Sequence, residues 1–335
     1  MRKVVLNMDI RQKLYQMFIL GTQGAGYEKA LKAGLGGIIF FTEDIKSVKQ
    51  FKNLIFEIKS NALIPPFLSI DQEGGRVERT ENIHGGKKYI SAKFAYEKGE
   101  EYLKKQTLQI ARELKSYGIN LNFAPCIDVN TNPANPIIGE RAFSSKVEDV
   151  IKCEKTVSKI YRENGIIPCV KHFPGHGDAD TDSHLTLPEI NLSLEEMERI
   201  HIKPFVSAVN NGIEMIMAAH LNCTCFEKGI PASLSKSAIG YLRNKLGFNG
   251  VIVSDDMMMK GVAQFGLQEA LETGIRAGLN MFIYRNSSPE IIETIEQLTQ
   301  RLSNDEELLQ NVELSFERIQ KIKTSFGILS KYLYF

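Results

Sequence analysis

The residues best suited to chemistry lie in one short segment, from Lys171 to His184. It holds three of the chain's six histidines and three aspartates, with two glycines and a proline among them. Proline and glycine at this density disfavour a regular helix or strand, so the segment is predicted to be a loop. Histidine titrates near neutral pH, and an aspartate two residues away can orient it and stabilise its charged form. The segment therefore predicts proton transfer.

Zinc binding is the alternative use of His172, His176 and His184. These histidines lack the helical, Glu-flanked i,i+4 pair of zinc hydrolases, and Pro174-Gly175 would break such a helix. A single Asp-x-His pair in a loop usually serves only local hydrogen bonding, but the clustering favours a functional loop. We expect no metal and no organic cofactor.

The charge balance argues against partners that bind through bulk electrostatics. The 335-residue chain has 41 basic and 40 acidic residues, which gives a formal net charge of +1. Neither a nucleic acid nor an anionic membrane is expected as a partner. The substrate must therefore be recognised by specific groups.

Cysteine usage and the short apolar runs predict the compartment. The five cysteines are an odd number without zinc-ribbon spacing, which favours a reducing environment. The apolar run at residues 4–6 is too short for a signal-peptide core, and no apolar stretch is long enough to span a bilayer. We expect a soluble, cytoplasmic protein.

Eight short apolar runs alternate with segments of helical periodicity. The runs are residues 17–20, 37–41, 67–70, 121–125, 168–170, 215–219, 251–253 and 281–284. The helical segments include 47–60, 99–117, 147–164, 194–211, 235–246 and 267–277. Eight buried strands alternating with helices indicate an α/β fold, a (β/α)8 TIM-type barrel, with a doubly wound open sheet as the alternative.

Polar residues directly after the runs favour the barrel, because active sites of this fold gather at the carboxyl ends of the strands. Asp71, Lys171, His220 and Asp255 each follow a different run or lie within a residue or two of its end. Residues 290–335 are expected to be C-terminal helices that pack on the barrel, since no new strand pattern begins there. Residues 1–335 would then form one catalytic domain, which we expect to be monomeric.

Several long motifs resemble glycoside hydrolase family 3, in its single-domain β-N-acetylglucosaminidase branch. They are IDQEGGRV (70–77), NFAP (122–125), NPANPIIGER (132–141), the loop 171–188 and VSDDM (253–257), in family order. The resemblance implies a retaining exo-β-N-acetylglucosaminidase of the cell-wall recycling type. Its substrate would be a peptidoglycan turnover fragment, N-acetylglucosamine linked β-1,4 to 1,6-anhydro-N-acetylmuramic acid with or without peptide.

The resemblance assigns the bond-breaking roles to three residues. A retaining glycosidase needs a carboxylate nucleophile and a proton donor. Asp255 matches the nucleophile; Asp256 competes for this role, but neighbours on an extended segment face opposite sides. His184 matches the general acid/base, and Asp182 would orient it while one ring nitrogen stays free for the glycosidic oxygen.

The resemblance also implies a sugar-binding set. Four residues match these positions: Asp71, Arg141, Lys171 and His172. Three further residues are expected to support or line the site: Asp128, His176 and His220. His84 and His201 are expected on the surface. Gly175 and Gly177 would let the loop open and close.

Residues 78–88 are more charged and glycine-rich than the resemblance leads us to expect, on the leaving-group side of the cleft.

Two other functions stay open. A phosphorylase would let phosphate displace the glycosyl intermediate, because an imidazole acid/base does not repel phosphate as a carboxylate would. A sugar-binding sensor would bind the same fragments without cleaving them.

Overall fold

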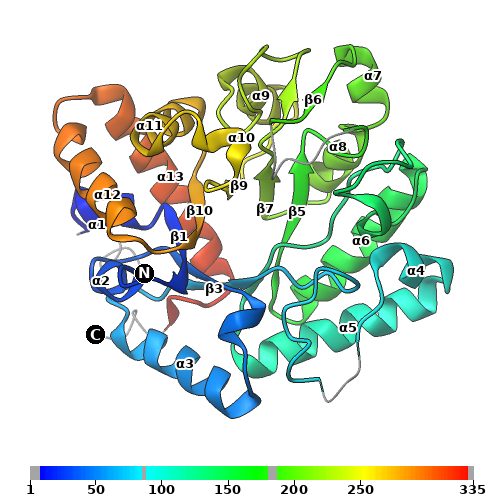
Figure 1. Cartoon of the computed structure of the whole chain (residues 1–335), viewed down its shortest axis with the longest axis horizontal. Helices are drawn as coiled ribbons and strands as arrows, with labels where there is room; N and C mark the ends of the chain where they lie inside the picture. The colour runs from blue at the N-terminus through cyan, green and yellow to red at the C-terminus, as the bar shows by residue number, and fades with distance from the viewer. Residues whose placement is uncertain (1–7, 85–87, 180–186, 331–335) are drawn as a thin grey trace.

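A closed barrel of eight parallel strands forms the centre of the protein (Figure 1). The computed structural model describes residues 8–84, 88–179 and 187–330. The strands occur around the barrel in the order β1-β10-β9-β7-β5-β4-β3-β2. They are β1 (Phe18–Gln23), β2 (Gly37–Phe40), β3 (Phe67–Ile70), β4 (Leu121–Asn122), β5 (Ile167–Phe173), β7 (Met215–Ala218), β9 (Val251–Asp256) and β10 (Met281–Asn286). The barrel prediction is confirmed, and the open-sheet alternative is wrong because β1 pairs with β10.

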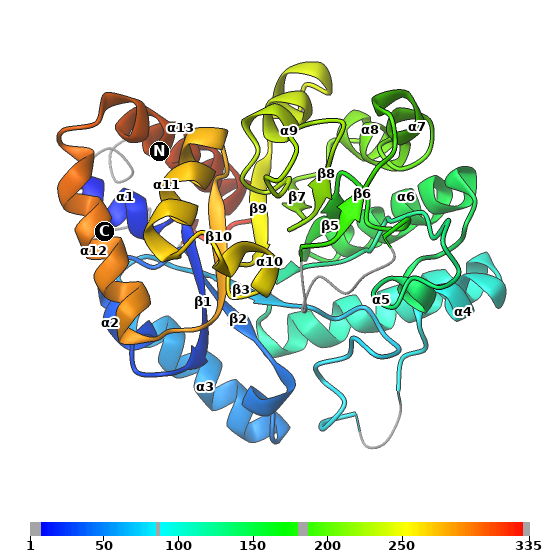
Figure 2. The same cartoon turned by 45° about the horizontal axis from the view of Figure 1, so that its top comes forward.

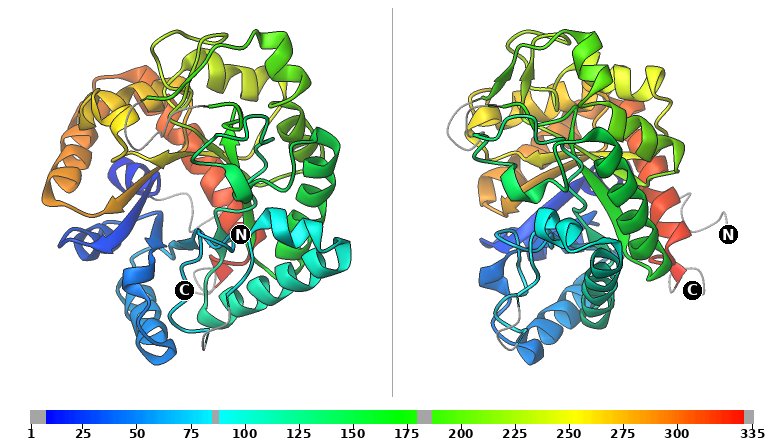
Figure 3. Two further views of the ribbon diagram at one scale, coloured as in Figure 1. Left: turned by 45° about the vertical axis from the view of Figure 1, so that its right-hand side comes forward. Right: turned by 90° about the vertical axis from the view of Figure 1, so that its right-hand side faces the viewer.

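Helices follow the strands and form an outer ring (Figures 2 and 3). The main ones are α2 (Tyr27–Lys32), α3 (Val48–Asn61), α5 (Glu100–Tyr117), α6 (Val147–Glu163), α8 (Lys203–Asn210), α9 (Lys236–Gly240) with its continuation η4 (Tyr241–Lys245), α11 (Leu267–Ala277) and α12 (Pro289–Leu302). Shorter elements are α1 (Ile10–Tyr15), α4 (Ala92–Glu97), α7 (Leu194–Arg199), α10 (Lys260–Ala263), η2 (Thr42–Asp44) and η3 (Gly139–Arg141). None of the helices in the described ranges is long and apolar enough to cross a membrane.

Local sequence explains why these segments fold as they do. In α3 the hydroxyl of Ser47 accepts a hydrogen bond from the amide of Gln50, which caps the helix. Phe51, Ile55 and Ile58 recur at helical spacing and are buried against the barrel. The barrel strands are buried on both faces over most of their length, as expected for parallel strands covered by helices.

Two local features differ from the predicted pattern. Residues 194–211 form two helices, α7 and α8, and Pro204 lies in the first turn of α8, where a missing amide hydrogen costs no helical bond. A two-stranded parallel sheet, β6 (Glu189–Ile190) with β8 (Asn222–Cys223), lies outside the barrel. Strands of two residues are too short to show an apolar pattern.

The C-terminal helices α12 and α13 (Glu306–Ser325) pack against other helices and the barrel. Helix α13 contacts α1, α11, α12 and β9, and α12 also contacts α1. Apolar residues from both helices join the cluster that contains the barrel strands. Helix α13 also reaches the start of β3, where Lys323 donates to the Pro65 carbonyl at 2.8 Å and lies 4.9 Å from the centre of the Phe67 ring.

Candidate active site

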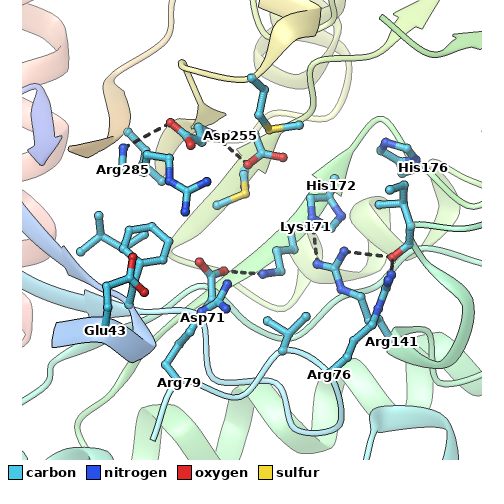
Figure 4. Close-up of a pocket in the computed structure, with 18 residues that line it drawn as sticks. Glu43, Asp71, Arg76, Arg79, Arg141, Lys171, His172, His176, Asp255 and Arg285 are labelled. Carbon is cyan, nitrogen blue, oxygen red and sulfur yellow. Dashed lines mark hydrogen bonds and ion pairs between the residues drawn. The ribbon is translucent and has the colours of Figure 1, made fainter. Parts of the chain in front are cut away.

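A cavity of about 370 Å³ opens at the carboxyl ends of the strands (Figure 4). Asp71 follows β3, Lys171 and His172 lie in β5, and Asp255 lies near the end of β9, and all four line the cavity. Its size is in the range of small-molecule sites. Three of the four strand-end residues singled out from the sequence, Asp71, Lys171 and Asp255, therefore converge on one space, whereas His220 is not among the residues that line it.

Lys171 and His172 are neighbours in β5, yet both face the cavity. In a regular strand their side chains would point to opposite faces. The pairing of β5 with β7 shifts register between Val170 and Phe173, around these two residues. Strand irregularities of this kind often re-aim side chains beside active sites.

Asp255 presents a carboxylate to the cavity (Figure 4). Its Oδ1 accepts a hydrogen bond of 2.7 Å from the backbone amide of Asp256. Burial alone would raise the pKa of Asp255, but His172, His220, the Asp256 amide and Lys171 outweigh it and lower the pKa. An ionised carboxylate at this position can act as a nucleophile or stabilise a developing positive charge.

Asp256 also lines the cavity, so the expectation that the two neighbours face opposite sides is wrong, but its carboxylate has a different environment. Its Oδ1 accepts hydrogen bonds from the backbone amides of Met258 at 3.1 Å and Arg285 at 3.2 Å. Burial, together with the charge of Asp255, raises the pKa of Asp256 to about 6. Since Asp256 is engaged with the turn after β9, the geometry favours Asp255 of the two candidate nucleophiles.

A buried ion-pair network joins the expected sugar-binding residues. The Nζ atom of Lys171 lies 2.6 Å from Asp71 Oδ1 and 2.6 Å from Glu73 Oε1. Arg141 donates two hydrogen bonds to Glu73, at 2.9 and 2.8 Å, and its Nη2 lies 3.3 Å from His172 Nε2. The network fixes the cationic groups that face the cavity.

Glu73 was not singled out from the sequence. Its side chain is 4% exposed, and although burial alone would raise its pKa, Arg141 and Lys171 hold the pKa well below its usual range. The Glu73 carboxylate therefore forms ion pairs with two cations, Arg141 and Lys171. A signal existed, because Glu73 stands two residues after Asp71 in the motif DQEGGR.

Asp128 holds the other side of His172. It is fully buried and accepts a 2.7 Å hydrogen bond from His172 Nδ1 and a 2.6 Å bond from the His176 amide. The Cys126 thiol donates to its Oδ2 at 3.2 Å. These contacts orient the imidazole, which leaves Nε2 on the side of Arg141. Asp128 therefore lies where it can fix the orientation of the His172 ring.

Cys126, Asp128 and His172 also form a group that could hold a metal ion, since their ligand atoms lie within 4.8 Å of one another. The thiol and the imidazole already hydrogen-bond to the carboxylate, and the cationic Arg141 lies beside the ring. Hydrogen bonding alone accounts for the arrangement. His176, which the zinc alternative paired with His172, is not in this group.

Three further histidines have buried side chains: His220, His201 and His84. His220 is 1% exposed, its ring contacts the hydroxyl of Ser233 at 2.7 Å and the Asp256 carbonyl at 3.1 Å, and it is not among the residues that line the cavity. His201 is also 1% exposed, and the side chain of His84 is 6% exposed. The expectation that His84 and His201 lie on the surface is wrong, because helix α5 and the segment after β5 cover them.

His176 lines the cavity and is 3% exposed. Neither ring nitrogen has a hydrogen-bond partner among the described residues. Burial, together with the nearby His172, lowers the pKa of His176, so its ring is neutral near pH 7. A neutral imidazole offers one donor and one acceptor to a bound ligand.

Asp182 and His184 fall within residues 180–186, outside the described part of the chain. Their roles therefore stay predictions. The two glycines earlier in the loop are held closely by their neighbours: a Cβ on Gly175 would lie 2.6 Å from His201 Cβ, and one on Gly177 would lie 1.8 Å from the Val129 carbonyl oxygen. Close packing is one reason for glycine at these two positions.

Arginines that the sequence reasoning missed also line the cavity: Arg76, Arg79 and Arg285 (Figure 4). The guanidinium carbons of Arg79 and Arg285 lie 5.5 and 5.4 Å from the centre of the Phe41 ring. Arg76 donates to the carbonyl of Ile137. The available signal was that Arg76 and Arg79 follow β3 and that Arg285 lies near the end of β10.

Comparison with known proteins places these motifs in a family. Residues 9–322 match the model of the glycosyl hydrolase family 3 N-terminal domain. The curated Beta-hexosaminidase A of Pseudoalteromonas piscicida is 31% identical over 87% of this chain and 53% of its own length. The Beta-hexosaminidase of Idiomarina loihiensis is 31% identical over 83% of this chain and 85% of its own length.

Solved structures agree with the sequence relatives. A glycoside hydrolase family 3 β-N-acetylglucosaminidase from a Paenibacillus species superposes with a TM-score of 0.88 at 31% identity, over 96% of this chain and 63% of that one. LpqI of Mycobacterium tuberculosis superposes with a TM-score of 0.83 at 27% identity, over 93% of each chain. This chain thus spans about half the length of the Pseudoalteromonas protein and less than two thirds of the length of the Paenibacillus protein.

Proposed function

Because the chain belongs to glycosyl hydrolase family 3, we propose that it is a retaining exo-β-N-acetylglucosaminidase. The observation that carries this proposal is that the Asp255 carboxylate, whose pKa is lowered, lines the same cavity as Asp71, Arg141, Lys171 and His172. Named relatives in both comparisons are β-hexosaminidases or β-N-acetylglucosaminidases. The described strand-end residues include a carboxylate and polar groups that could bind hydroxyls, whereas the proposed proton donor, His184, lies outside the described residues.

In the proposed first step a carboxylate oxygen of Asp255 attacks the anomeric carbon and forms a glycosyl-enzyme bond. His184 donates a proton to the departing glycosidic oxygen, with Asp182 as its orienting partner. In the second step His184 takes a proton from water, the water oxygen attacks the anomeric carbon, and the bond to Asp255 breaks. The product is β-N-acetylglucosamine, so configuration is retained.

The sugar-binding set in this proposal is Asp71, Arg141, Lys171 and His172, because the ion-pair network holds all four at the cavity. Asp128 positions His172, and His220 contributes to the low pKa of Asp255. His176 offers its unpaired ring nitrogens to the bound sugar. Charged donors and acceptors fixed in this way can read several hydroxyl groups of one ring.

We further propose that the natural substrate is the peptidoglycan turnover fragment named above. The reaction needs no metal or organic cofactor in this scheme, and dialysis against EDTA tests that point. One catalytic domain over residues 1–335, a monomeric state and a cytoplasmic location are also part of the proposal. Sedimentation and cell fractionation test the last two.

A phosphorylase is the second candidate, and one observation favours it. Arg76, Arg79 and Arg285 line the cavity, and guanidinium groups bind phosphate well. Phosphate would then displace the sugar from Asp255 in place of water and give a sugar 1-phosphate.

The test is NMR of the protein with an aryl β-N-acetylglucosaminide, once with phosphate and once without. N-Acetylglucosamine appearing first as the β-anomer in both buffers would establish a retaining hydrolase. Sugar 1-phosphate in the phosphate buffer would establish the phosphorylase. Sugar binding without turnover in either buffer would contradict both and favour a sensor.

A further inference from the structure

The ring of His220 lies between a hydroxyl and a carbonyl, next to the carboxylate proposed as the nucleophile. Its Nδ1 is 2.7 Å from the hydroxyl of Ser233, and its Nε2 is 3.1 Å from the backbone carbonyl oxygen of Asp256. His220 directly follows the end of β7 by one residue, and Ser233 lies between β8 and α9. Both side chains are buried, at 1% and 0% exposed. The proposed mechanism uses neither contact.

The two contacts agree on which ring nitrogen carries the proton. A carbonyl oxygen can only accept a hydrogen bond, so Nε2 of His220 must be the donor to Asp256. Burial lowers the pKa of His220, although the charge of Asp255 and contacts with the backbone act in the opposite direction, and this favours the neutral ring near neutral pH. In the neutral ring Nδ1 is then an acceptor, and the hydroxyl of Ser233 donates to it.

The backbone around Ser233 holds its hydroxyl in place. The amide of Ser233 donates to the carbonyl of Ala219 at 3.0 Å, and the amide of Ala232 donates to the carbonyl of Leu221 at 2.8 Å. These two acceptors stand on either side of His220 in the sequence, so the segment that carries Ser233 is fixed beside the ring. A hydroxyl fixed in this way can hold the orientation of the imidazole.

The carbonyl of Asp256 belongs to the turn that presents the Asp255 carboxylate to the cavity (Figure 4). It also accepts a hydrogen bond of 3.0 Å from the amide of Met259. The amide of Asp256 donates to Asp255 Oδ1 at 2.7 Å. Asp256 is therefore held at its carbonyl by His220 and holds the neighbouring carboxylate at its amide. A misplacement of reacting groups by about 1 Å can cost roughly 100-fold in rate.

We propose that Ser233 and His220 are positioning residues for the nucleophile. Ser233 holds the ring of His220, His220 holds the carbonyl of Asp256, and the amide of Asp256 holds the carboxylate of Asp255. Neither Ser233 nor His220 is among the described residues that line the cavity, so both act through Asp256 rather than on the sugar. The effect on turnover rests on the proposed function, whereas the state of the ring does not.

The kinetic test compares variants at the two positions on an aryl β-N-acetylglucosaminide. His220→Gln keeps an N–H donor at about the distance of Nε2 from the backbone, whereas the side chain in His220→Asn is too short to reach the carbonyl of Asp256. His220→Asn should lower kcat by roughly 10- to 100-fold with KM nearly unchanged, and His220→Gln should retain most of the activity. Ser233→Ala should lower kcat by roughly tenfold, and Ser233→Thr, which keeps a hydroxyl, should restore it.

Ser315→Ala is the matched control for Ser233→Ala. The hydroxyl of Ser315 is also buried, at 2% exposed, and accepts a hydrogen bond of 3.0 Å from the side chain of Asn280. Ser315 lies in α13 and is not among the residues that line the cavity. We expect both serine variants to lose stability but only Ser233→Ala to lose kcat. An equal loss of kcat in the two variants would indicate a merely structural role for Ser233 and overturn the inference.

A spectroscopic readout does not depend on activity. Nitrogen NMR of isotope-labelled histidine distinguishes a protonated from an unprotonated ring nitrogen, and the signals of His220 are those that disappear in His220→Gln. Wild type should carry a proton on Nε2 and none on Nδ1 near neutral pH, and Ser233→Ala should exchange the Nε2 proton with water faster.

A proton on Nδ1 of His220 in wild type near neutral pH would overturn the inference. Unchanged proton exchange in Ser233→Ala would overturn it as well. Faster exchange in Ser233→Ala together with an inactive wild type would instead count against the proposed function alone, because the ring would still be held by Ser233.

Discussion

The ammonium group of Lys171 lies 2.6 Å from Glu73, and both side chains are almost completely buried. Glu73 also receives two hydrogen bonds from Arg141, so one carboxylate serves two of the cations that face the cavity. Removing one partner of a buried ion pair leaves a charge without compensation.

We therefore predict that Glu73→Gln lowers the free energy of unfolding by about 3–5 kcal/mol and reduces kcat/KM. Urea unfolding and steady-state kinetics measure the two effects. Glu313→Gln is the matched control, because its pair with Lys13 is at the surface and should contribute no more than about 1 kcal/mol. Equal stability losses in the two variants would contradict the central position of Glu73.

The stability of the protein should depend on pH through two buried carboxylates, Glu73 and Asp128. Glu73 and Asp128 have pKa values well below their ordinary ones, despite burial, because Arg141 and Lys171 face the first and His172 and His176 face the second. A depressed pKa contributes stability that is present above the unfolded pKa and is lost as the pH falls below it. We expect the urea midpoint to fall steeply below about pH 4. The slope should be shallower in Glu73→Gln, and an unchanged slope would refute the assignment.

The two neighbouring aspartates of β9 should respond differently to the same substitution. Asp255→Asn should reduce turnover by several orders of magnitude while sugar binding, measured by calorimetry, persists. Asp256→Asn should be milder, because its amide oxygen can still accept from the Met258 and Arg285 amides. A larger loss of turnover in Asp256→Asn than in Asp255→Asn would assign the nucleophile role to Asp256 instead.

His184 is predicted to act as a proton donor to the leaving group. His184→Ala should then slow glycosylation least for aryl glycosides with good leaving groups, which need little protonation. Pre-steady-state rates across a leaving-group series measure this. Asp182→Asn should give the same pattern with smaller amplitude, and uniform slowing across the series would argue against the role.

The close approach at Gly177 gives a stability prediction. A Cβ there would lie 1.8 Å from the Val129 carbonyl oxygen, so Gly177→Ala must displace backbone and should cost about 1–3 kcal/mol or more. Gly240→Ala in α9 is the matched control, since the nearest atom to its Cβ is the Asn244 side chain at 3.8 Å. It should be neutral or stabilising by up to about 1 kcal/mol. Thermal unfolding of both variants measures the difference.

Apolar runs and their polar boundaries were sufficient to place the eight barrel strands and to point to Asp71, Lys171, His172 and the pair Asp255 and Asp256; the family resemblance, not the pattern, chose Asp255. The reason is that a strand covered on both faces is apolar over most of its length, so the first polar residues mark the part near its carboxyl end that faces the cavity. Motifs also sufficed to recognise the family, because they are long and keep their order.

The tertiary structure decided which charges meet. Glu73 and Arg141 are 68 residues apart, and Lys171 lies farther along the chain, so their pairing depends on how neighbouring strands close into a barrel. Likewise, His84 lies 3.1 Å from Glu113 because α5 packs beside the segment that follows β3. Short-range patterns carry information on strands and helices, but the partner of a buried charge is set by contacts between segments distant in sequence.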